Sequence, residues 1–169
     1  MKAIVLFAAV AACAAAQTHV EAPMHTETTF QLNVATSYAK AFALFGPEGE
    51  RAWAGVHWDP HVVWPKPPRD AAGIVFTVAK GPLTSVWVNT EWDQKAGRLK
   101  YVYVIPAVMT TTIELRLRDE GAQTHVTVTY ARTALSEQGR AHVEAMTKDD
   151  QRAGVEWQAS LDALLQQKK

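Results

Sequence analysis

The sequence has a single cysteine, Cys13, and no excess of charge of either sign. Seventeen lysine and arginine residues balance seventeen aspartate and glutamate residues among the 169 residues of the chain. Nucleic-acid-binding proteins concentrate basic residues in a patch or stripe, so we predict no nucleic-acid partner. The chain also lacks a Gly-x-Ser-x-Gly string and a glycine-rich phosphate loop. These absences argue against a serine nucleophile and a phosphate-binding loop.

The N-terminal segment is typical of a secretory signal peptide. Lys2 precedes an apolar stretch over 3–12, and small residues before Gln17 form a cleavage site. The stretch is too short for a membrane span. We predict a signal peptide over 1–16, a flexible lead-in over 17–24, and an exported protein that is periplasmic or secreted. A buried N-terminal helix is the alternative interpretation of the alanine run.

Cys13 leaves a second alternative open, because the string VAAC at 10–13 resembles a bacterial lipobox. In that case Cys13 would carry a lipid and anchor the protein to a membrane. After simple cleavage the mature chain has no cysteine, and therefore no disulfide, thiol nucleophile or thiolate metal ligand. Packing alone then stabilises one domain, which we assign to residues 25–169.

Alternation of apolar and polar residues predicts a strand-rich domain. A half-buried strand over 28–34 comes first, and helical spacing over 35–45 and 48–53 predicts two short helices. Glycine and polar residues between the later strands indicate antiparallel hairpins. The six later strands are predicted over 61–64, 73–78, 83–92, 99–105, 111–118 and 124–132.

The C-terminal segment predicts one long helix that begins after Ser136, a good N-cap residue. Asp150 falls on the apolar stripe of this helix. The other members of the stripe are Val143, Met146, Ala153, Trp157, Leu161 and Leu164. The element order predicts an α+β protein with a helix-grip fold, in which a curved antiparallel β-sheet wraps around the long C-terminal helix and two short helices follow the first strand.

Four stretches and the terminal helix with Trp157 resemble bacterial members of the START-like superfamily (SRPBCC), which includes polyketide cyclases and dehydratases. The stretches are FALFGPEGERAWAGVHWDPHVVWP, VFTV, VWVNTEWD and VTVTYARTALSEQG. Within them, Phe45, the Glu-x-x-Trp pair Glu50 and Trp53, the string 58–60 and the string 133–136 carry the likeness. The resemblance implies a deep, mostly apolar cavity between helix and sheet that accepts a hydrophobic small molecule and needs no cofactor.

Aromatic side chains, methionines and one carboxylate are the candidate ligand-binding groups. Tryptophan suits a cavity wall because a large apolar body carries one N–H group that needs a partner. Alternatively, the strand aromatics pack across the outer face of the sheet. The candidates are Trp58, Trp64, Trp87, Tyr101, Met109, Met146, Asp150 and Trp157.

The start of the strand-rich region contains two histidines and an aspartate, which allow a metal site as an alternative interpretation. On an extended chain His57, Asp59 and His61 point to one side, and such ligands suit zinc or iron. Pro60 interrupts this alternation, so we favour an aromatic closure of the cavity by the neighbouring tryptophans. We predict no metal and no cofactor.

Three functions follow as hypotheses. The first is binding of a hydrophobic small molecule, which could be lipid-like, polyketide-like or aromatic. The second is a cofactor-free cyclase or dehydratase that uses Asp150, Glu91, His57 or a tyrosine for proton transfer. The third is an interaction module of the cell envelope with an exposed aromatic end. For Asp150 we favour a position at the solvent edge beside Lys148 and Arg152. The sequence makes no prediction of an oligomeric state.

Overall fold

The computed structural model describes residues 24–167. The predicted signal peptide, nearly all of the lead-in and Cys13 lie outside the described residues. Export and lipid anchoring therefore stay predictions. Within the described range, none of the helices combines the length and the apolar character that crossing a membrane requires.

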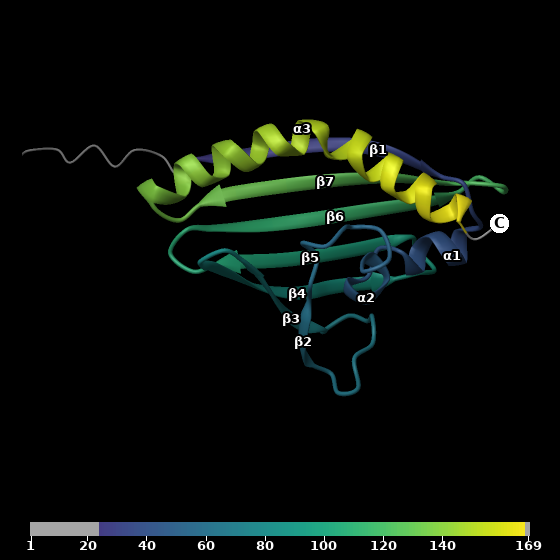
Figure 1. The fold of residues 1–169 in the computed structure, drawn as a ribbon, viewed down its shortest axis with the longest axis horizontal. Coiled ribbons are helices and arrows are strands. Elements are labelled where there is room, and N and C mark those ends of the chain that lie inside the picture. Colours follow the sequence, from purple (N-terminus) through teal and green to yellow (C-terminus); the bar gives the residue numbers. More distant parts are fainter. Residues whose placement is uncertain (1–23, 168–169) are drawn as a thin grey trace, which may run out of the picture.

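Seven strands form one antiparallel sheet, in which the first and the last strand of the chain pair with each other (Figure 1). The order across the sheet is β1-β7-β6-β5-β4-β3-β2. The predicted strands are all confirmed, and β1, β6 and β7 extend beyond the predicted bounds. The strands are β1 (His25–Val34), β2 (His61–Trp64), β3 (Val75–Lys80), β4 (Leu83–Asp93), β5 (Arg98–Ile105), β6 (Met109–Asp119) and β7 (Thr124–Ala134).

Three helices complete the fold, and their order confirms the helix-grip prediction. α1 (Tyr38–Ala43) and α2 (Pro47–Glu50) follow β1, and both are shorter than the helical spacing predicts. α3 (Glu137–Gln166) is the long C-terminal helix. The Ser136 side chain caps it, since its hydroxyl oxygen accepts a hydrogen bond from the N–H of Gly139 at 3.1 Å.

α3 lies along one side of the sheet, where it packs mainly against β1 and β7 (Figure 1). Its first turn approaches the β5–β6 connection closely. A side chain at Gly139 would place its Cβ only 1.9 Å from the carbonyl oxygen of Val108, so glycine is required there. Because α3 covers the β1–β7 side, it leaves space over the inner face of the strands on the other side.

The inner face of β4 and β5 carries aromatic side chains. In β5, Tyr101 and Tyr103 are buried, and Trp87 of β4 lies opposite Tyr103 in the register. A register shift after Asn89 then turns Trp92 inward, where its ring meets Phe42 of α1 edge to face at 5.1 Å. The strand aromatics therefore pack inside the molecule, and the alternative of outer-face packing is wrong for Trp87 and both tyrosines.

Candidate functional site

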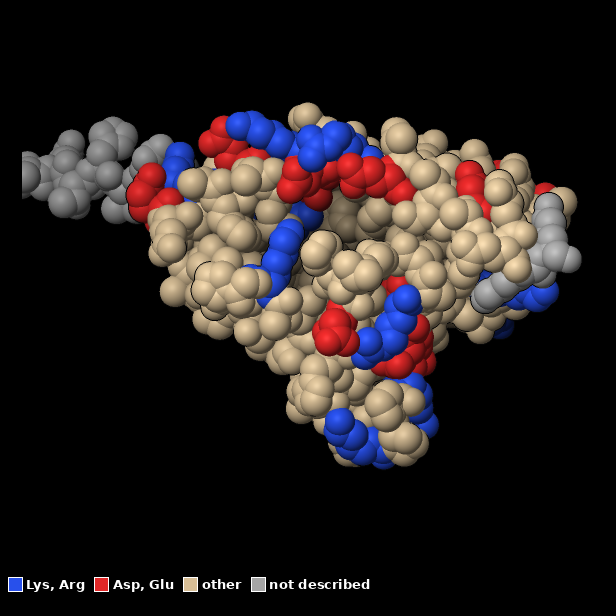
Figure 2. All heavy atoms as spheres, in the orientation of Figure 1, with Lys and Arg blue, Asp and Glu red and all other residues tan. Residues whose placement is uncertain are grey.

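A cavity of about 300 Å³ lies between α3 and the inner face of the sheet. Figure 2 shows the molecule hollowed next to α3, with acidic and basic side chains at the rim. Most of the wall is aromatic or aliphatic, and three tryptophans and three tyrosines contribute to it. The lining residues are Glu50, Ala54, His57, Trp58, Val78, Lys80, Trp87, Tyr101, Tyr103, Ile113, Leu115, Tyr130, Arg132, Met146 and Trp157.

A second chamber of about 310 Å³ adjoins the first. Ser85 and His142 contribute polar groups to it, and Trp87, Tyr103 and Met146 belong to the walls of both chambers. The rings of Trp87 and Tyr103 stack with their centroids 4.1 Å apart. This stacked pair forms a rigid wall shared by the two chambers.

Five of the predicted ligand-binding residues line the first chamber, namely Trp58, Trp87, Tyr101, Met146 and Trp157. Trp58 is half-buried, and its Nε1–H donates to the carbonyl oxygen of Pro47 at 3.0 Å. This tryptophan is therefore part of the cavity wall and not of an exposed aromatic patch.

Two of the predicted residues lie elsewhere. Trp64 is 63% exposed on the edge strand β2, where a register shift after Val62 interrupts the pairing with β3. Met109 is fully buried at the start of β6, close to Val108 and the first turn of α3. Neither residue lines either chamber. The structure therefore does not bring these two residues to the cavity, and their contact with a ligand stays a prediction.

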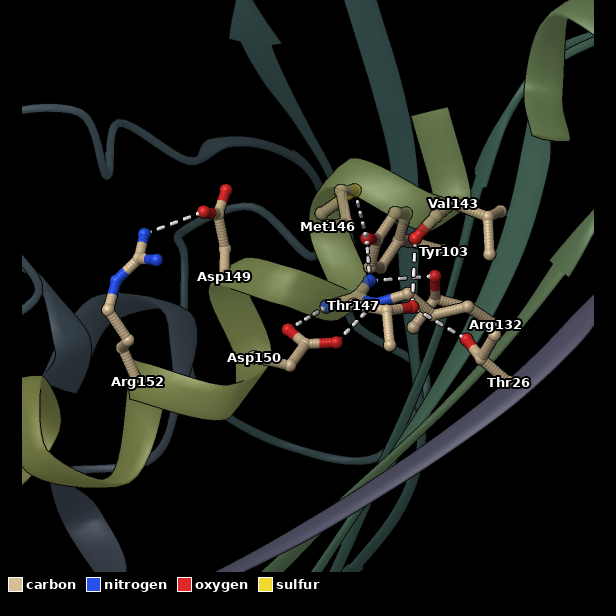
Figure 3. A network of polar contacts seen from close by, with 10 residues as sticks. Thr26, Tyr103, Arg132, Val143, Met146, Thr147, Asp149, Asp150 and Arg152 are labelled. Atoms are coloured by element: carbon tan, nitrogen blue, oxygen red, sulfur yellow. Dashed lines mark hydrogen bonds and ion pairs between the residues drawn. The ribbon is translucent and has the colours of Figure 1, made fainter. Parts of the chain in front are cut away.

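Asp150 forms a buried ion pair with Arg132, a residue of β7 that the sequence interpretation did not single out (Figure 3). The guanidinium donates through Nε at 2.7 Å and through Nη2 at 2.6 Å to the two carboxylate oxygens. Its Nη1 donates to the hydroxyl oxygens of Tyr103 at 2.6 Å and Thr111 at 3.1 Å. The pair thus ties α3 to β5, β6 and β7.

The charge of this network is balanced inside the protein. Burial alone would lower the pKa of the Arg132 guanidinium, but the hydrogen bonds to Asp150 raise it above its usual value. The guanidinium carbon also lies 4.5 Å from the centre of the Tyr130 ring, a cation–π arrangement. The predicted position of Asp150 at the solvent edge is wrong. It is 6% exposed, and its neighbour Arg152 pairs with Asp149 instead.

Glu50 is the second acidic group near the cavity, and its situation differs. It ends α2 and lines the first chamber, but its carboxyl has no hydrogen-bond or ion-pair partner in the part of the chain that the structure covers. Burial, together with the nearby charge of Asp70, raises the pKa of Glu50 well above its ordinary value of 4.5. The Glu50 carboxyl group therefore holds its proton to a higher pH than an ordinary glutamate does.

Asp70 is the charged group that lies near Glu50. Its carboxylate accepts hydrogen bonds from the N–H groups of Glu48 at 3.1 Å and Gly49 at 3.3 Å. Burial raises the pKa of Asp70, and these two bonds oppose the shift. Asp70, whose carboxylate is hydrogen-bonded, therefore lies near Glu50, whose carboxyl group has no partner.

Tyr101 and Asn89 complete the polar groups at this end of the sheet. The Tyr101 hydroxyl donates to the carbonyl oxygen of Phe45 at 2.7 Å, and burial with the nearby Glu50 raises its pKa well above 10.0. Asn89 is fully buried, and neither polar atom of its side-chain amide has a hydrogen-bond partner at normal distance and angle among residues 24–167, although the amide lies close enough to the Tyr101 hydroxyl to oppose part of the rise in its pKa. Unsatisfied buried amides are costly and rare.

The remaining candidates for proton transfer lie outside the cavity or at its edge. Glu91 pairs with Arg98 at 2.7 Å and lines neither chamber. His57 lines the first chamber but is exposed, so it lies at the edge of the wall. Of the residues proposed for acid–base chemistry, only His57 and the tyrosines are open to the cavity.

The alternative metal site is not formed. Asp59 is exposed and pairs with Arg51 at 2.9 Å, whereas His61 lies exposed on β2. Over the described segment, no group of three or more histidine, cysteine, aspartate or glutamate side chains is placed to hold a metal ion.

Two important residues were missed at the sequence level, although the signals existed. Arg132 continues the alternation of Val126, Val128 and Tyr130, which places it on the inner face of β7. A positive charge on that face and a negative charge on the apolar stripe of α3 together indicate a buried pair. Glu50 belongs to the Glu-x-x-Trp string, but only the packing of α2 against the sheet shows that it reaches the cavity.

The curved sheet, the long helix and the cavity that opens between them define a helix-grip fold. The likeness to the START-like superfamily drawn from the sequence is confirmed at the level of the fold. The sequence matches no model of a known protein family. No curated protein matches it in sequence either.

Solved structures with this fold include a plant enzyme and a bacterial protein. Norcoclaurine synthase from Thalictrum flavum superposes with a TM-score of 0.60 at 10% identity, over 85% of this chain and 87% of that one. A second structure of that enzyme contains dopamine and hydroxybenzaldehyde, and has a TM-score of 0.60 at 11% identity over 87% and 90% of the two chains. An uncharacterized protein from Rhizobium leguminosarum has a TM-score of 0.59 at 12% identity over 84% and 97%. At such identities the likeness concerns the fold.

Proposed function

We propose that this protein binds a small hydrophobic molecule with an aromatic or polyketide-like ring system in the cavity between α3 and the sheet. The observation that carries the proposal is a chamber of about 300 Å³ lined mainly by aromatic and aliphatic side chains. Cavities of this size and composition bury most of a small ligand and orient it with a few polar groups. The small aromatic compounds in the norcoclaurine synthase structure support a ligand of similar size.

The aromatic wall favours flat rings over flexible acyl chains. Trp58 and Trp87 meet edge to face at 5.5 Å, and Trp87 stacks on Tyr103. Trp157 of α3 adds a further ring that packs against Trp53 at 5.0 Å. An aromatic ligand can add its own ring to such a cluster through the same stacked or edge-to-face contacts.

Native mass spectrometry of the purified mature protein, followed by organic extraction, tests the proposal. A stoichiometric small hydrophobic compound is the expected result. A matched pair of variants locates it. Ala54→Trp places a large side chain in the chamber wall, whereas Ala52→Trp places the same side chain on an exposed neighbour. Loss of the compound from both variants, or from neither, contradicts binding in this chamber.

Glu50 favours a second candidate function, cofactor-free acid–base catalysis on the bound molecule. Its carboxyl group is unpartnered among the described side chains, lines the chamber, and has a raised pKa. A carboxyl group that holds its proton to a higher pH than usual can act as a general acid toward a bound substrate. This observation extends the predicted cyclase or dehydratase activity to a residue that the sequence interpretation did not propose.

Glu50→Gln separates the two functions. The amide keeps the size and the polarity of the side chain but cannot transfer a proton. If the protein is an enzyme, the variant retains the extracted compound and loses its conversion, measured by mass spectrometry of the products. Equal conversion by both proteins contradicts a catalytic role for Glu50.

A further inference from the structure

Tyr103 occupies a distinctive place in the cavity. It lies on the inner face of β5 and belongs to the walls of both chambers. Stacking on Trp87 at a centroid distance of 4.1 Å fixes the plane of its ring. Its hydroxyl group is therefore presented from a rigid position at the junction of the two chambers.

Arg132 determines which role the Tyr103 hydroxyl plays. A guanidinium group only donates hydrogen bonds, so at 2.6 Å from Nη1 of Arg132 the tyrosine oxygen is the acceptor. The guanidinium cannot turn away, because Asp150 accepts hydrogen bonds from two of its nitrogens (Figure 3). Thr111 accepts a further hydrogen bond from Nη1. The hydroxyl proton of Tyr103 must point elsewhere.

The acceptor that this proton meets is weak. The Tyr103 hydroxyl donates to Sδ of Met146 at 3.8 Å, and a thioether sulfur is a poor hydrogen-bond acceptor. Met146 lines both chambers and has a flexible side chain, so a ligand can displace it. In contrast, the Tyr101 hydroxyl on the same strand is committed to the carbonyl oxygen of Phe45 at 2.7 Å.

We propose that the Tyr103 hydroxyl donates a hydrogen bond to a neutral acceptor oxygen of the ligand, and that this contact selects carbonyl-containing molecules. The inference rests on the proposed binding function. A ketone, ester or amide oxygen fits, because the charge of Arg132 is already balanced by Asp150 and the donor carries no net charge. Arg132 and Asp150 act as positioning residues, since they orient the hydroxyl without touching the ligand oxygen.

Two probes of nearly equal shape test this contact, 2-acetylnaphthalene and 2-ethylnaphthalene, which differ by the carbonyl oxygen. Their dissociation constants are measured by tryptophan fluorescence with wild-type protein and with Tyr103→Phe. We expect the variant to weaken binding of the ketone about three- to tenfold, as expected for one neutral hydrogen bond, and to leave the hydrocarbon unchanged. Tyr38→Phe removes a hydroxyl outside the cavity, which donates to Gln94, and serves as control.

The alternatives give different results. Loss of the ketone preference in Tyr101→Phe or Tyr130→Phe, with Tyr103→Phe unaffected, overturns the assignment to Tyr103 and leaves the binding function standing. Equal affinities for the ketone in all variants overturn it too. If neither probe binds wild-type protein, the proposed function fails and this inference fails with it.

Infrared spectroscopy of the wild-type complex gives an independent readout. A hydrogen bond lowers the carbonyl stretching frequency of 2-acetylnaphthalene relative to its value in hexane. We expect the lowered frequency in the wild-type complex and its return toward the hexane value in Tyr103→Phe. A wild-type complex with the hexane frequency overturns the proposal, whether or not the variant folds.

Discussion

Two polar regions lie under the same sheet and have opposite character. In the paired region, Arg132, Asp150, Tyr103 and Thr111 satisfy one another through short hydrogen bonds. In the unpaired region, the Glu50 carboxyl and the Asn89 amide have no partner among the side chains that the structure describes. The paired region holds its side chains in one arrangement, whereas the unpaired region leaves the Glu50 carboxyl group open to the first chamber and the Asn89 amide buried.

The two regions differ in whether their buried polar groups have hydrogen-bond partners. A polar group without a hydrogen bond costs free energy in an apolar environment, and a charge costs more. At Arg132 the protein meets this cost, because Asp150, Tyr103 and Thr111 accept hydrogen bonds from the guanidinium. At Glu50 no partner meets it, and burial raises the pKa of the carboxyl group instead. We infer that the paired region orients a donor toward the ligand and that the Glu50 carboxyl group, which lines the first chamber, gains a partner when a ligand binds.

Breaking the paired region has the largest expected effect. Asp150→Leu leaves the buried Arg132 charge without its partner, and we expect a loss of about 3–5 kcal/mol in the free energy of unfolding. Asp149→Leu is the control on the same helix, because its pair with Arg152 is exposed and contributes at most about 1 kcal/mol. Urea denaturation of both variants measures the difference.

The double variant Arg132→Met with Asp150→Leu sharpens this result. Replacing a whole buried pair by apolar residues of similar volume is often neutral, so we expect it to recover at least half of the stability lost in Asp150→Leu. A double variant as unstable as the single one shows instead that the contacts of Arg132 with Tyr103 and Thr111 dominate the stability of this region.

The same residues show how much of the molecule could be predicted from the sequence. The strands, the order of the elements and the Ser136 cap follow from local patterns, and the structure confirms them. The inner face of β7 was predicted as far as Tyr130. Arg132 continues the same alternation. A charged residue after a series of apolar ones indicates the end of the buried stretch, unless its partner on α3 is known.

The unpaired region could not be predicted, because it depends on contacts between distant elements. Glu50 looks like a residue of a polar turn, and only the packing of α2 over the sheet brings it to the chamber. Asn89 lies in a stretch of β4 with apolar residues on both faces, so alternation does not assign its side. Met109 and Trp64 were placed in the cavity for their residue type, and their strand positions prevent it.

Asn89→Leu tests the unpaired region directly. Leucine has a similar volume and no polar atoms, so we expect a gain of about 1–3 kcal/mol in the free energy of unfolding. Asn89→Asp is the contrasting variant, and we expect it to destabilise the protein because it buries a carboxyl group without a partner. A loss of stability in Asn89→Leu shows that the amide is hydrogen-bonded in solution.

Glu50→Gln has a pH-dependent effect. The pKa of Glu50 is raised in the folded protein, so the folded state holds its proton more tightly than the unfolded state. Stability therefore falls as pH rises above 4.5, until the folded-state pKa is passed. Thermal denaturation from pH 4 to pH 9 should show the variant gaining on the wild type over this range. A constant difference between the two contradicts the raised pKa.

The smallest expected effect concerns Tyr101, which lies next to the unpaired region but has a partner. Tyr101→Phe removes the hydroxyl that donates to the Phe45 carbonyl, and we expect a loss of about 1 kcal/mol at neutral pH. This loss should have the opposite sign to the gain in Asn89→Leu, although the two residues face each other across β4 and β5. Opposite signs at neighbouring positions follow only if partnering, and not burial, decides what each polar group contributes. Urea denaturation of the two single variants and the double variant measures both effects and their coupling.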